Sequence, residues 1–258
     1  MNNNPNKIIV GVIQLNIEWE NLEANFNLVK YYIEKYHTKN IDLFVLPEMF
    51  LTGFTFNKEV ALDYDSIFFN ELLNLTYKFK ISLMGSLLFE EDNKLYNRLF
   101  YLSNGKVIDY YDKKHLFTLS EENKFLTPGS EQKIFLLDSF KIFPIICYDL
   151  RFPIWCRNKN YRYDILVVSA NWPEARIDAW DKLLVARAIE NQCYVLASNR
   201  TGFDKNGNYY NGHSCIIDFN GNIINSLLNK EGIAIEELNF SKLFDFRKKY
   251  PFVIDDTE

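Results

Sequence analysis

The segment Ile142–Pro153, with the sequence IFPIICYDLRFP, joins an apolar run to a polar cluster at a cysteine. The run Lys141–Ile146 is typical of a buried strand, and Cys147 follows its last residue. This position predicts a sharp strand-to-helix turn, a geometry that can present a nucleophile. A following helix N-terminus would lower the pKa of the thiol, and the next amide could face an oxyanion. The alternative is a buried structural cysteine, a common fate of free thiols.

Apolar runs and amphipathic stretches alternate on both sides of this segment. Strands are predicted at Lys7–Leu15, Ile41–Leu46, Ile81–Leu88, Tyr163–Ala170, Tyr194–Ser198 and Gly232–Leu238. Helices are predicted at Asn21–Lys39, Ser66–Phe79, Arg176–Gln192 and Phe240–Lys249. Three hairpins are predicted, pairing Leu95–Leu102 with Lys106–Asp112, Lys133–Leu137 with Lys141–Ile146, and His213–Phe219 with Asn222–Leu228. Helices that alternate with strands at both ends indicate an α/β layered fold.

The composition narrows the class of protein. The chain has 258 residues, of which 48% are hydrophobic, and it shows neither an internal repeat nor a Pro-, Gly- or Ser-rich linker. We therefore expect one domain over residues 1–258, with a core from about 7 to 238 and a C-terminal extension at 239–258. A net charge of -5 argues against nucleic acid as a partner. No apolar stretch is long enough for a membrane span, so we expect a cytoplasmic protein without a membrane partner.

The cysteines carry no metal-binding signature. Cys147, Cys156, Cys193 and Cys215 lack CxxC spacing, so we expect free thiols and no zinc or other metal site. Cys156, Cys193 and Cys215 lie in apolar or helical contexts and are expected to be structural. Cys147 is the candidate nucleophile.

Two further polar residues stand at strand ends, where open α/β folds form their sites. Glu48 follows the apolar run Leu43–Leu46 and Pro47, so a carboxylate lies at the edge of the core, as a general base requires. Lys113 directly follows the predicted strand Lys106–Asp112 and would supply a positive charge to a developing oxyanion. The alternatives are a loop glutamate that caps a turn and a solvated Lys113-Lys114 pair.

Three separated motifs resemble the signatures of the nitrilase (carbon–nitrogen hydrolase) superfamily. They are Leu46-Pro47-Glu48, Tyr111–Phe117 and Cys147–Pro153. The order Glu, Lys, Cys matches, and the likeness runs from about Lys7 to about Leu238. Three smaller pieces, Thr52-Gly53-Phe54, Ser169–Pro173 and Arg187–Asn191, are similar to the omega-amidase branch. Bacterial members of that branch act on 2-oxoglutaramate and 2-oxosuccinamate.

The resemblance implies a set of catalytic residues. It assigns Glu48 as base, Cys147 as nucleophile, and Lys113 with the backbone N–H of Tyr148 as the oxyanion site. Lys113 is chosen over Lys114 because the family lysine lies two residues before the motif histidine, here His115. A second family glutamate precedes the turn Thr127-Pro128-Gly129 and falls on Glu122, with Glu121 as the alternative.

The implied chemistry is amide hydrolysis through a cysteine thioester, with no cofactor and a small amide as substrate. The same residues would also serve an N-carbamoyl amine, a deaminated glutathione or a nitrile. A non-catalytic scaffold would have an altered Glu, Lys or Cys, whereas all three are present. A histidine base is disfavoured because His37 and His213 belong to other elements, and His115 is expected to brace the lysine loop.

Substrate contacts are less readable from the sequence. Phe117 and Trp172 either wall the pocket or belong to the core. Because an omega-amidase must anchor a second carboxylate, Arg151, Arg176 and Arg200 are possible anchors. For Arg151 we favour a structural pairing with Asp149. Asp42 and Asp149 are expected beside the site, without an assigned role.

The resemblance also implies the architecture and the assembly. The expected fold is a four-layer α-β-β-α sandwich in one domain, and family members assemble into homodimers or larger homo-oligomers. The predicted helix Arg176–Gln192 has an apolar stripe of Ile177, Trp180, Leu183, Leu184 and Ala188. That stripe suits either a subunit contact or packing on its own sheet.

Overall fold

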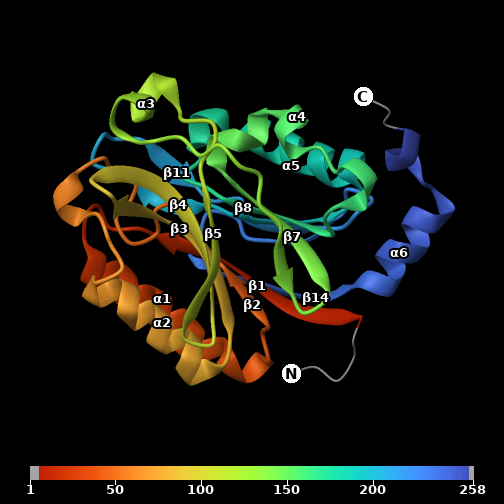
Figure 1. Ribbon diagram of the computed structural model, residues 1–258, viewed down its shortest axis with the longest axis horizontal. Helices are drawn as coiled ribbons and strands as arrows, with labels where there is room; N and C mark the ends of the chain where they lie inside the picture. Colours follow the sequence, from red (N-terminus) through yellow and green to blue (C-terminus); the bar gives the residue numbers. More distant parts are fainter. Residues whose placement is uncertain (1–5, 256–258) are drawn as a thin grey trace.

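Two β-sheets lie face to face between layers of helices in the computed structural model, which describes residues 6–255 (Figure 1). The first sheet has eight strands: β1 (Lys7–Asn16), β2 (Leu43–Val45), β3 (Ser82–Glu91), β4 (Lys94–Ser103), β5 (Lys106–Asp112), β10 (Arg200–Phe203), β11 (Tyr209–Asn211) and β14 (Gly232–Asn239). Their order is β11-β10-β1-β2-β3-β4-β5, and β14 pairs antiparallel with β1.

The second sheet has six strands: β6 (Phe135–Leu137), β7 (Phe140–Ile146), β8 (Ile165–Ser169), β9 (Tyr194–Ser198), β12 (Cys215–Ile217) and β13 (Ile223–Ser226). Strands β7, β8 and β9 are parallel, with Ile146 beside Ser169 and Ser169 beside Ser198. Strands β1, β2 and β3 are parallel in the first sheet. Each sheet therefore gathers the carboxyl ends of three parallel strands at one edge, the usual place for a site.

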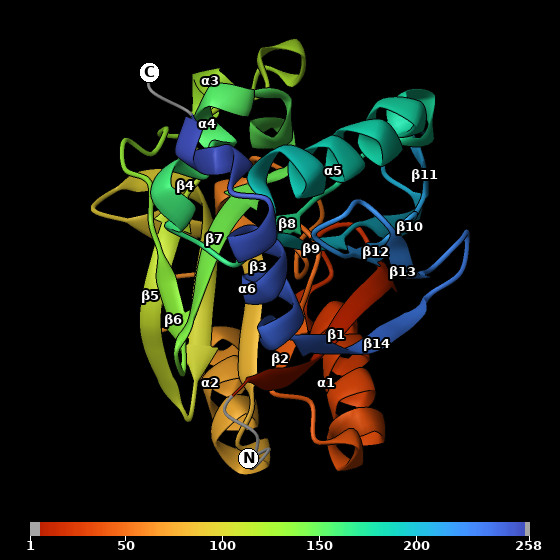
Figure 2. The same cartoon turned by 90° about the vertical axis from the view of Figure 1, so that its right-hand side faces the viewer.

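Helices cover the outer faces of both sheets, and Figure 2 shows the same arrangement from the side. The first sheet is covered by α1 (Leu22–Tyr36) and α2 (Ile67–Phe79), and the second by α5 (Ile177–Asn191). The expected four-layer α-β-β-α sandwich is therefore confirmed. In α5, Trp180, Leu184 and Ala188 are buried, so the apolar stripe packs mainly on its own sheet.

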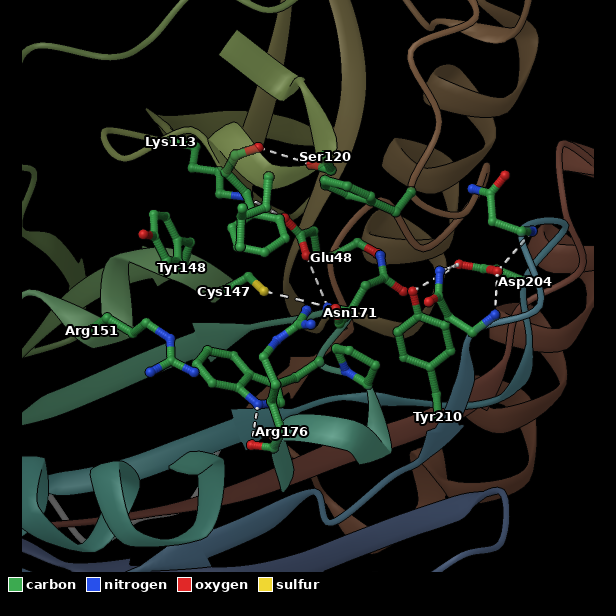
Figure 3. A pocket seen from close by; sticks show the side chains of 17 residues that line it. Glu48, Lys113, Ser120, Cys147, Tyr148, Arg151, Asn171, Arg176, Asp204 and Tyr210 are labelled. Carbon is green, nitrogen blue, oxygen red and sulfur yellow. Dashed lines mark hydrogen bonds and ion pairs between the residues drawn. The ribbon is translucent and has the colours of Figure 1, made fainter. Parts of the chain in front are cut away.

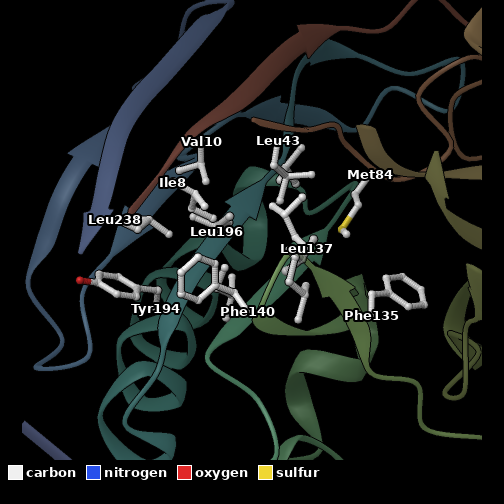
Figure 4. Close-up of a cluster of buried hydrophobic side chains, with 14 of the residues drawn as sticks. Ile8, Val10, Leu43, Met84, Phe135, Leu137, Phe140, Tyr194, Leu196 and Leu238 are labelled. Carbon is white, nitrogen blue, oxygen red and sulfur yellow. The ribbon is translucent and has the colours of Figure 1, made fainter. Parts of the chain in front are cut away.

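The main core fills the space between the two sheets (Figure 4). Ile8, Val10 and Leu43 of the first sheet pack with Leu137 and Leu196 of the second. Burial of such side chains removes apolar surface from water and stabilises each by about 1.5–3 kcal/mol. The two sheets are therefore held as one rigid body, which allows residues from both to build a single site.

The packed core continues past residue 238, the boundary expected from the sequence. Helix α6 (Phe240–Lys249) contributes Phe240 and Leu243 to the inter-sheet core, and Phe240 stacks on Phe140 with ring centroids 3.5 Å apart. Arg247 donates to Asp164 at 2.7 Å as a buried ion pair. Residues 240–247 of the expected extension thus pack into the core.

The predicted helices and hairpins form within a few residues of the expected bounds. The Asn21 side chain accepts the Ala24 N–H and begins α1, whereas His37–Lys39 is a separate 3₁₀ turn. The three hairpins pair as expected. The hairpin β10–β11 was not predicted, because its sequence is polar and lacks the alternation of a half-buried strand. Within residues 6–255, no helix has both the length and the apolar character needed to cross a bilayer.

Candidate active site

Glu48, Lys113 and Glu122 form a fully buried charged cluster at the edge of the first sheet. Glu48 follows β2, Lys113 follows β5, and Glu122 begins the short helix α3 (Glu122–Phe125). Lys113 Nζ lies 2.8 Å from Glu48 Oε1 and 3.0 and 2.9 Å from the two Glu122 oxygens. A buried ammonium between two carboxylates is electrostatically satisfied on both sides.

The charges of the cluster shift the pKa values of Lys113 and Glu122. Burial alone would lower the pKa of Lys113, but the carboxylates of Glu122 and Glu48 outweigh it and raise that pKa, so the ammonium stays charged. Burial and the nearby Glu48 carboxylate raise the pKa of Glu122, although Lys113 opposes them. Glu122 also accepts the Phe117 N–H at 2.6 Å, which ties the lysine loop to the cluster.

The geometry decides between the two adjacent glutamates and between the two adjacent lysines that the sequence offered as site residues. Glu121 is exposed and pairs with Lys124 at 2.6 Å, away from Lys113. The Lys114 ammonium lies over the Trp155 ring, 5.7 Å from its centroid. Lys113, and not Lys114, therefore contacts Glu48, and Glu122, and not Glu121, contacts Lys113.

Cys147 lies on a strained turn at the end of β7, as predicted. Its φ is +44°, and it is the first residue of a 3₁₀ helix, Cys147–Arg151. A left-handed backbone costs a non-glycine residue about 1–2 kcal/mol and must be held by its surroundings. The Sγ atom donates to the Asn171 carbonyl at 3.8 Å and faces Glu48 (Figure 3).

The expectation that a helix N-terminus lowers the thiol pKa is wrong. Burial, and next the Glu48 carboxylate, raise the pKa of Cys147 well above its usual value, and Lys113 offsets only part of this. The helix that follows is a single short 3₁₀ segment, which carries little dipole. The thiol of Cys147 is therefore protonated at neutral pH.

Glu48 is held by three donors. Its Oε1 accepts from Lys113 Nζ at 2.8 Å and from Asn97 Nδ2 at 2.7 Å, and its Oε2 accepts the Asn171 N–H at 2.9 Å. The Asn171 amide also donates to the Glu48 carbonyl at 2.7 Å. Asn97 was not singled out in the sequence, because an Asn within a hairpin strand carries no local signal of burial.

Asp149 braces the turn from behind. Its Oδ1 accepts the His115 N–H and faces His115 Nδ1 at 2.8 Å, and its Oδ2 accepts the Tyr111 hydroxyl at 2.8 Å and the Ile146 N–H at 3.1 Å. His115 also stacks on Phe152, with centroids 3.7 Å apart. Asp149 thus joins the lysine loop to the cysteine turn, and His115 braces the loop as expected.

Two other expectations about charged residues are corrected. Arg151 does not pair with Asp149, whose oxygens are already occupied. Instead its guanidinium lies over the Trp172 ring, 4.8 Å from the centroid. Asp42 does not lie beside the site, because it accepts the Ile9 N–H at the opposite end of β2 from Glu48.

A cavity of about 380 Å³ opens onto Glu48, Lys113 and Cys147 (Figure 3). Its lining includes Glu48, Lys113, Cys147, Phe117, Tyr148, Trp172, Arg151, Arg176 and Tyr210. The guanidinium of Arg176 lies over the Phe117 ring at 5.1 Å. Neither Arg151 nor Arg176 has an ion-pair partner in the part of the chain that the structure describes. Both are available to an anionic group in the cavity.

Arg200, the third possible anchor, has a structural role. Its guanidinium is buried and donates to the carbonyls of Ile17, Thr201 and Phe203. The other three cysteines are buried free thiols. Among residues 6–255, no three His, Cys, Asp or Glu side chains are arranged to hold a metal ion.

Comparison with known proteins gives consistent matches over almost the whole chain. The family model for carbon–nitrogen hydrolases matches residues 9–248. The 2-oxoglutaramate amidase of Bacillus subtilis (strain 168) is 36% identical over 255 residues, which is 97% of each chain. Omega-amidase YafV of Escherichia coli (strain K12) is 36% identical over 81% of this chain and 82% of its own.

Solved structures agree with these matches. The fold is similar to that of XC1258 from Xanthomonas campestris, a CN-hydrolase superfamily protein with an arsenic adduct in its active site. The TM-score is 0.93 at 31% identity, over 98% of both chains.

Proposed function

The chain belongs to the carbon–nitrogen hydrolase family, and from this premise we propose that it is an omega-amidase. Its substrates are the small 2-oxo acid amides 2-oxoglutaramate and 2-oxosuccinamate, and its products are the dicarboxylate and ammonia. Relatives at 35–36% identity that are named 2-oxoglutaramate amidase and omega-amidase support this choice. The observation that carries the chemistry is that Cys147, Glu48 and Lys113 line one cavity, with Lys113 held between Glu48 and Glu122.

Acylation begins with proton transfer. Glu48 takes the proton of the Cys147 thiol, and the sulfur attacks the carboxamide carbon to form a C–S bond. Lys113 Nζ and the Tyr148 N–H stabilise the negative oxygen of the tetrahedral intermediate, and one such donor contributes about 3–4 kcal/mol. The C–N bond then breaks, Glu48 returns its proton to the leaving nitrogen, and ammonia departs from a thioester.

Deacylation repeats the proton transfers with water. Glu48, again a carboxylate, takes a proton from water while the water oxygen attacks the thioester carbon. The C–S bond breaks, the thiolate regains its proton from Glu48, and the carboxylic acid leaves. Glu122 keeps the ammonium of Lys113 charged and directed at the oxyanion in both halves of the reaction.

Recognition of the substrate rests on charge in the cavity. The far carboxylate of an oxo acid amide needs a cation that is not already paired, and a guanidinium can bind it through two hydrogen bonds. Arg151 and Arg176 meet this requirement, while the faces of Trp172 and Phe117 hold the two guanidinium groups. Replacement of either arginine by Met should raise KM for the oxo amides more than it lowers kcat.

The proposal is tested by ammonia release. The substrates are 2-oxoglutaramate, 2-oxosuccinamate, an N-carbamoyl amine and an aliphatic nitrile, each with the wild type, Cys147→Ala and Cys215→Ala. Cys215 is buried in β12 away from the cavity, so its variant controls for loss of a buried thiol. We expect release from the oxo amides, lost only in Cys147→Ala. Preference for another substrate would overturn the substrate assignment, and full activity of Cys147→Ala would overturn the mechanism.

A further inference from the structure

Asn97 contacts all three charged residues of the site at once. Its side-chain Nδ2 donates to Glu48 Oε1 at 2.7 Å and to Glu122 Oε1 at 3.2 Å. Its main-chain carbonyl accepts the Lys113 N–H at 3.0 Å. The side chain is 1% exposed, so these bonds are made without competition from water.

The orientation of the Asn97 amide is held by Ser86 on the neighbouring strand. Ser86 Oγ accepts the Met49 N–H at 2.9 Å and donates to Asn97 Oδ1 at 2.7 Å. In the β3–β4 register, Asn97 pairs with Leu88, which makes Ser86 its diagonal neighbour on the same face. The reversed amide would set Oδ1 against two carboxylates, so the NH₂ group must face the glutamates.

These contacts leave one acceptor site on the Glu48 carboxylate. An ionised carboxylate has about four lone-pair sites. Lys113 and Asn97 occupy the two on Oε1, and the Asn171 N–H occupies one on Oε2. The remaining site, on Oε2, is open to a proton.

We propose that Asn97 is the positioning residue that decides which oxygen of Glu48 acts as the base. Its amide holds Oε1 beside Lys113 and ties Glu48 to Glu122, so Oε2 takes the proton of Cys147. Asn97 touches no substrate and acts through Glu48. The inference rests on the proposed function, because it requires Cys147 and Glu48 to carry the reaction.

The first test is Asn97→Ala, with Asn158→Ala as the matched control. Asn158 is also fully buried, and its side chain makes three bonds to the backbone of residues 163 and 191, at a distance from the site. Loss of a hydrogen bond to a charged group should lower kcat by about 10- to 100-fold. KM should stay within about twofold, because no substrate contact is lost. The control should lower the melting temperature and keep the wild-type kcat.

The second test removes the residue that orients the amide. Ser86→Ala should lower kcat less than Asn97→Ala does, and the double variant should be no slower than Asn97→Ala alone, because the two residues act through one group. Ser86→Ala also keeps the proposal testable if Asn97→Ala fails to fold. Full additivity of the two losses would overturn the proposal.

Alkylation of Cys147 by iodoacetamide separates this inference from the substrate assignment, since the thiol must still give its proton to Glu48. Asn97→Ala should slow alkylation by about the same factor as kcat, and Asn158→Ala should not. If the wild type releases no ammonia from any amide, the proposed function fails, whereas the alkylation rates still test Asn97. An alkylation rate in Asn97→Ala within about twofold of wild type, or a rise in KM with kcat unchanged, overturns the inference.

Discussion

At the scale of single residues, Lys113 has two roles that can be separated. It compensates the charges of Glu48 and Glu122, and its ammonium is the proposed oxyanion donor. All three side chains are at most 1% exposed, so the compensation takes place in a low-dielectric interior where an unpaired charge is costly. The two roles predict different responses to mutation.

Lys113→Met should lower kcat by about 10²- to 10³-fold, because an oxyanion donor is lost, and should destabilise the fold by about 3–5 kcal/mol, because it leaves two buried carboxylates together. Adding Glu122→Gln removes one of those charges and should restore part of the melting temperature. The kcat for ammonia release should remain about 10²- to 10³-fold down, because the oxyanion donor is still missing. Recovery of activity in the double variant would show that Lys113 only compensates the charges of the two glutamates and is not an oxyanion donor.

The raised pKa of Cys147 predicts a pH dependence for the free thiol. Because the pKa of the thiol is raised, very little thiolate is present at pH 7. Without a base in the protein, the rate at which the thiol reacts must therefore depend on the hydroxide concentration. In Glu48→Gln the charge of Glu48 is gone but burial still raises the pKa of Cys147, so alkylation by iodoacetamide should rise with pH across the neutral range, by up to about tenfold per pH unit while the thiol is protonated. The wild type should show a shallower slope, because Glu48 takes the proton.

The other thiols provide an internal control for that measurement. Burial raises the pKa of Cys156 and of Cys215 to about 12. Cys193 is also buried, and its pKa is raised for the same reason. The folded wild type should consequently gain one adduct by mass spectrometry, and Cys147→Ala none. A second adduct at neutral pH would show that the pH slope does not report on Cys147.

At the scale of elements, the site depends on how closely the loop after α3 approaches the end of β5. The Gly129 N–H donates to the Lys113 carbonyl at 2.9 Å, and a Cβ built on Gly129 would lie 2.1 Å from the Asp112 carbonyl oxygen. Both contacts are with backbone, which cannot rotate away. This glycine is required by close packing, since its φ is not positive.

Gly129→Ala should therefore displace the backbone that carries Lys113. A shift of about 1 Å at a catalytic group can cost about 100-fold in rate, so kcat should fall by about that factor. Gly232→Ala in β14 is the matched control, because its added Cβ would meet only the flexible Leu227 side chain at 3.2 Å. Equal kcat values for the two variants would contradict the prediction.

At the scale of the whole molecule, we propose a homodimer. The inner stripe of α5 is buried on its own sheet, so the contact must use outward residues of the helix. Ile189 in α5 is 51% exposed, and Gly221, in the turn before β13, lies against it. Ile223 in β13 is 54% exposed. A subunit contact would cover exposed apolar side chains, and these two isoleucines are the ones we assign to it.

Light scattering after size-exclusion chromatography should give twice the 30.6 kDa mass of the chain. Ile189→Lys places a charge in the proposed contact and should shift the mass toward the monomer, while circular dichroism remains unchanged because the residue is exposed. A wild-type monomer at micromolar concentration would contradict the homodimer.

Local sequence patterns are enough to predict most of the helices and strands and the strand-end positions of Glu48, Lys113 and Cys147. These are local properties, because a short continuous apolar run followed by a polar residue indicates where a buried strand ends. The short polar hairpin β10–β11 has no such pattern, and its strands form because β10 pairs with the end of β1.

Which of these residues contact one another depends on the three-dimensional fold. Glu122 rather than Glu121 reaches Lys113, Asn97 bonds Glu48 from 49 residues away, and the Asn171 N–H from 123 residues away. The same holds for Arg151, which lies over Trp172, and for the thiol pKa, which burial and Glu48 raise. These properties arise from burial, register and charge across both sheets. They depend on distances in space that local sequence patterns do not contain.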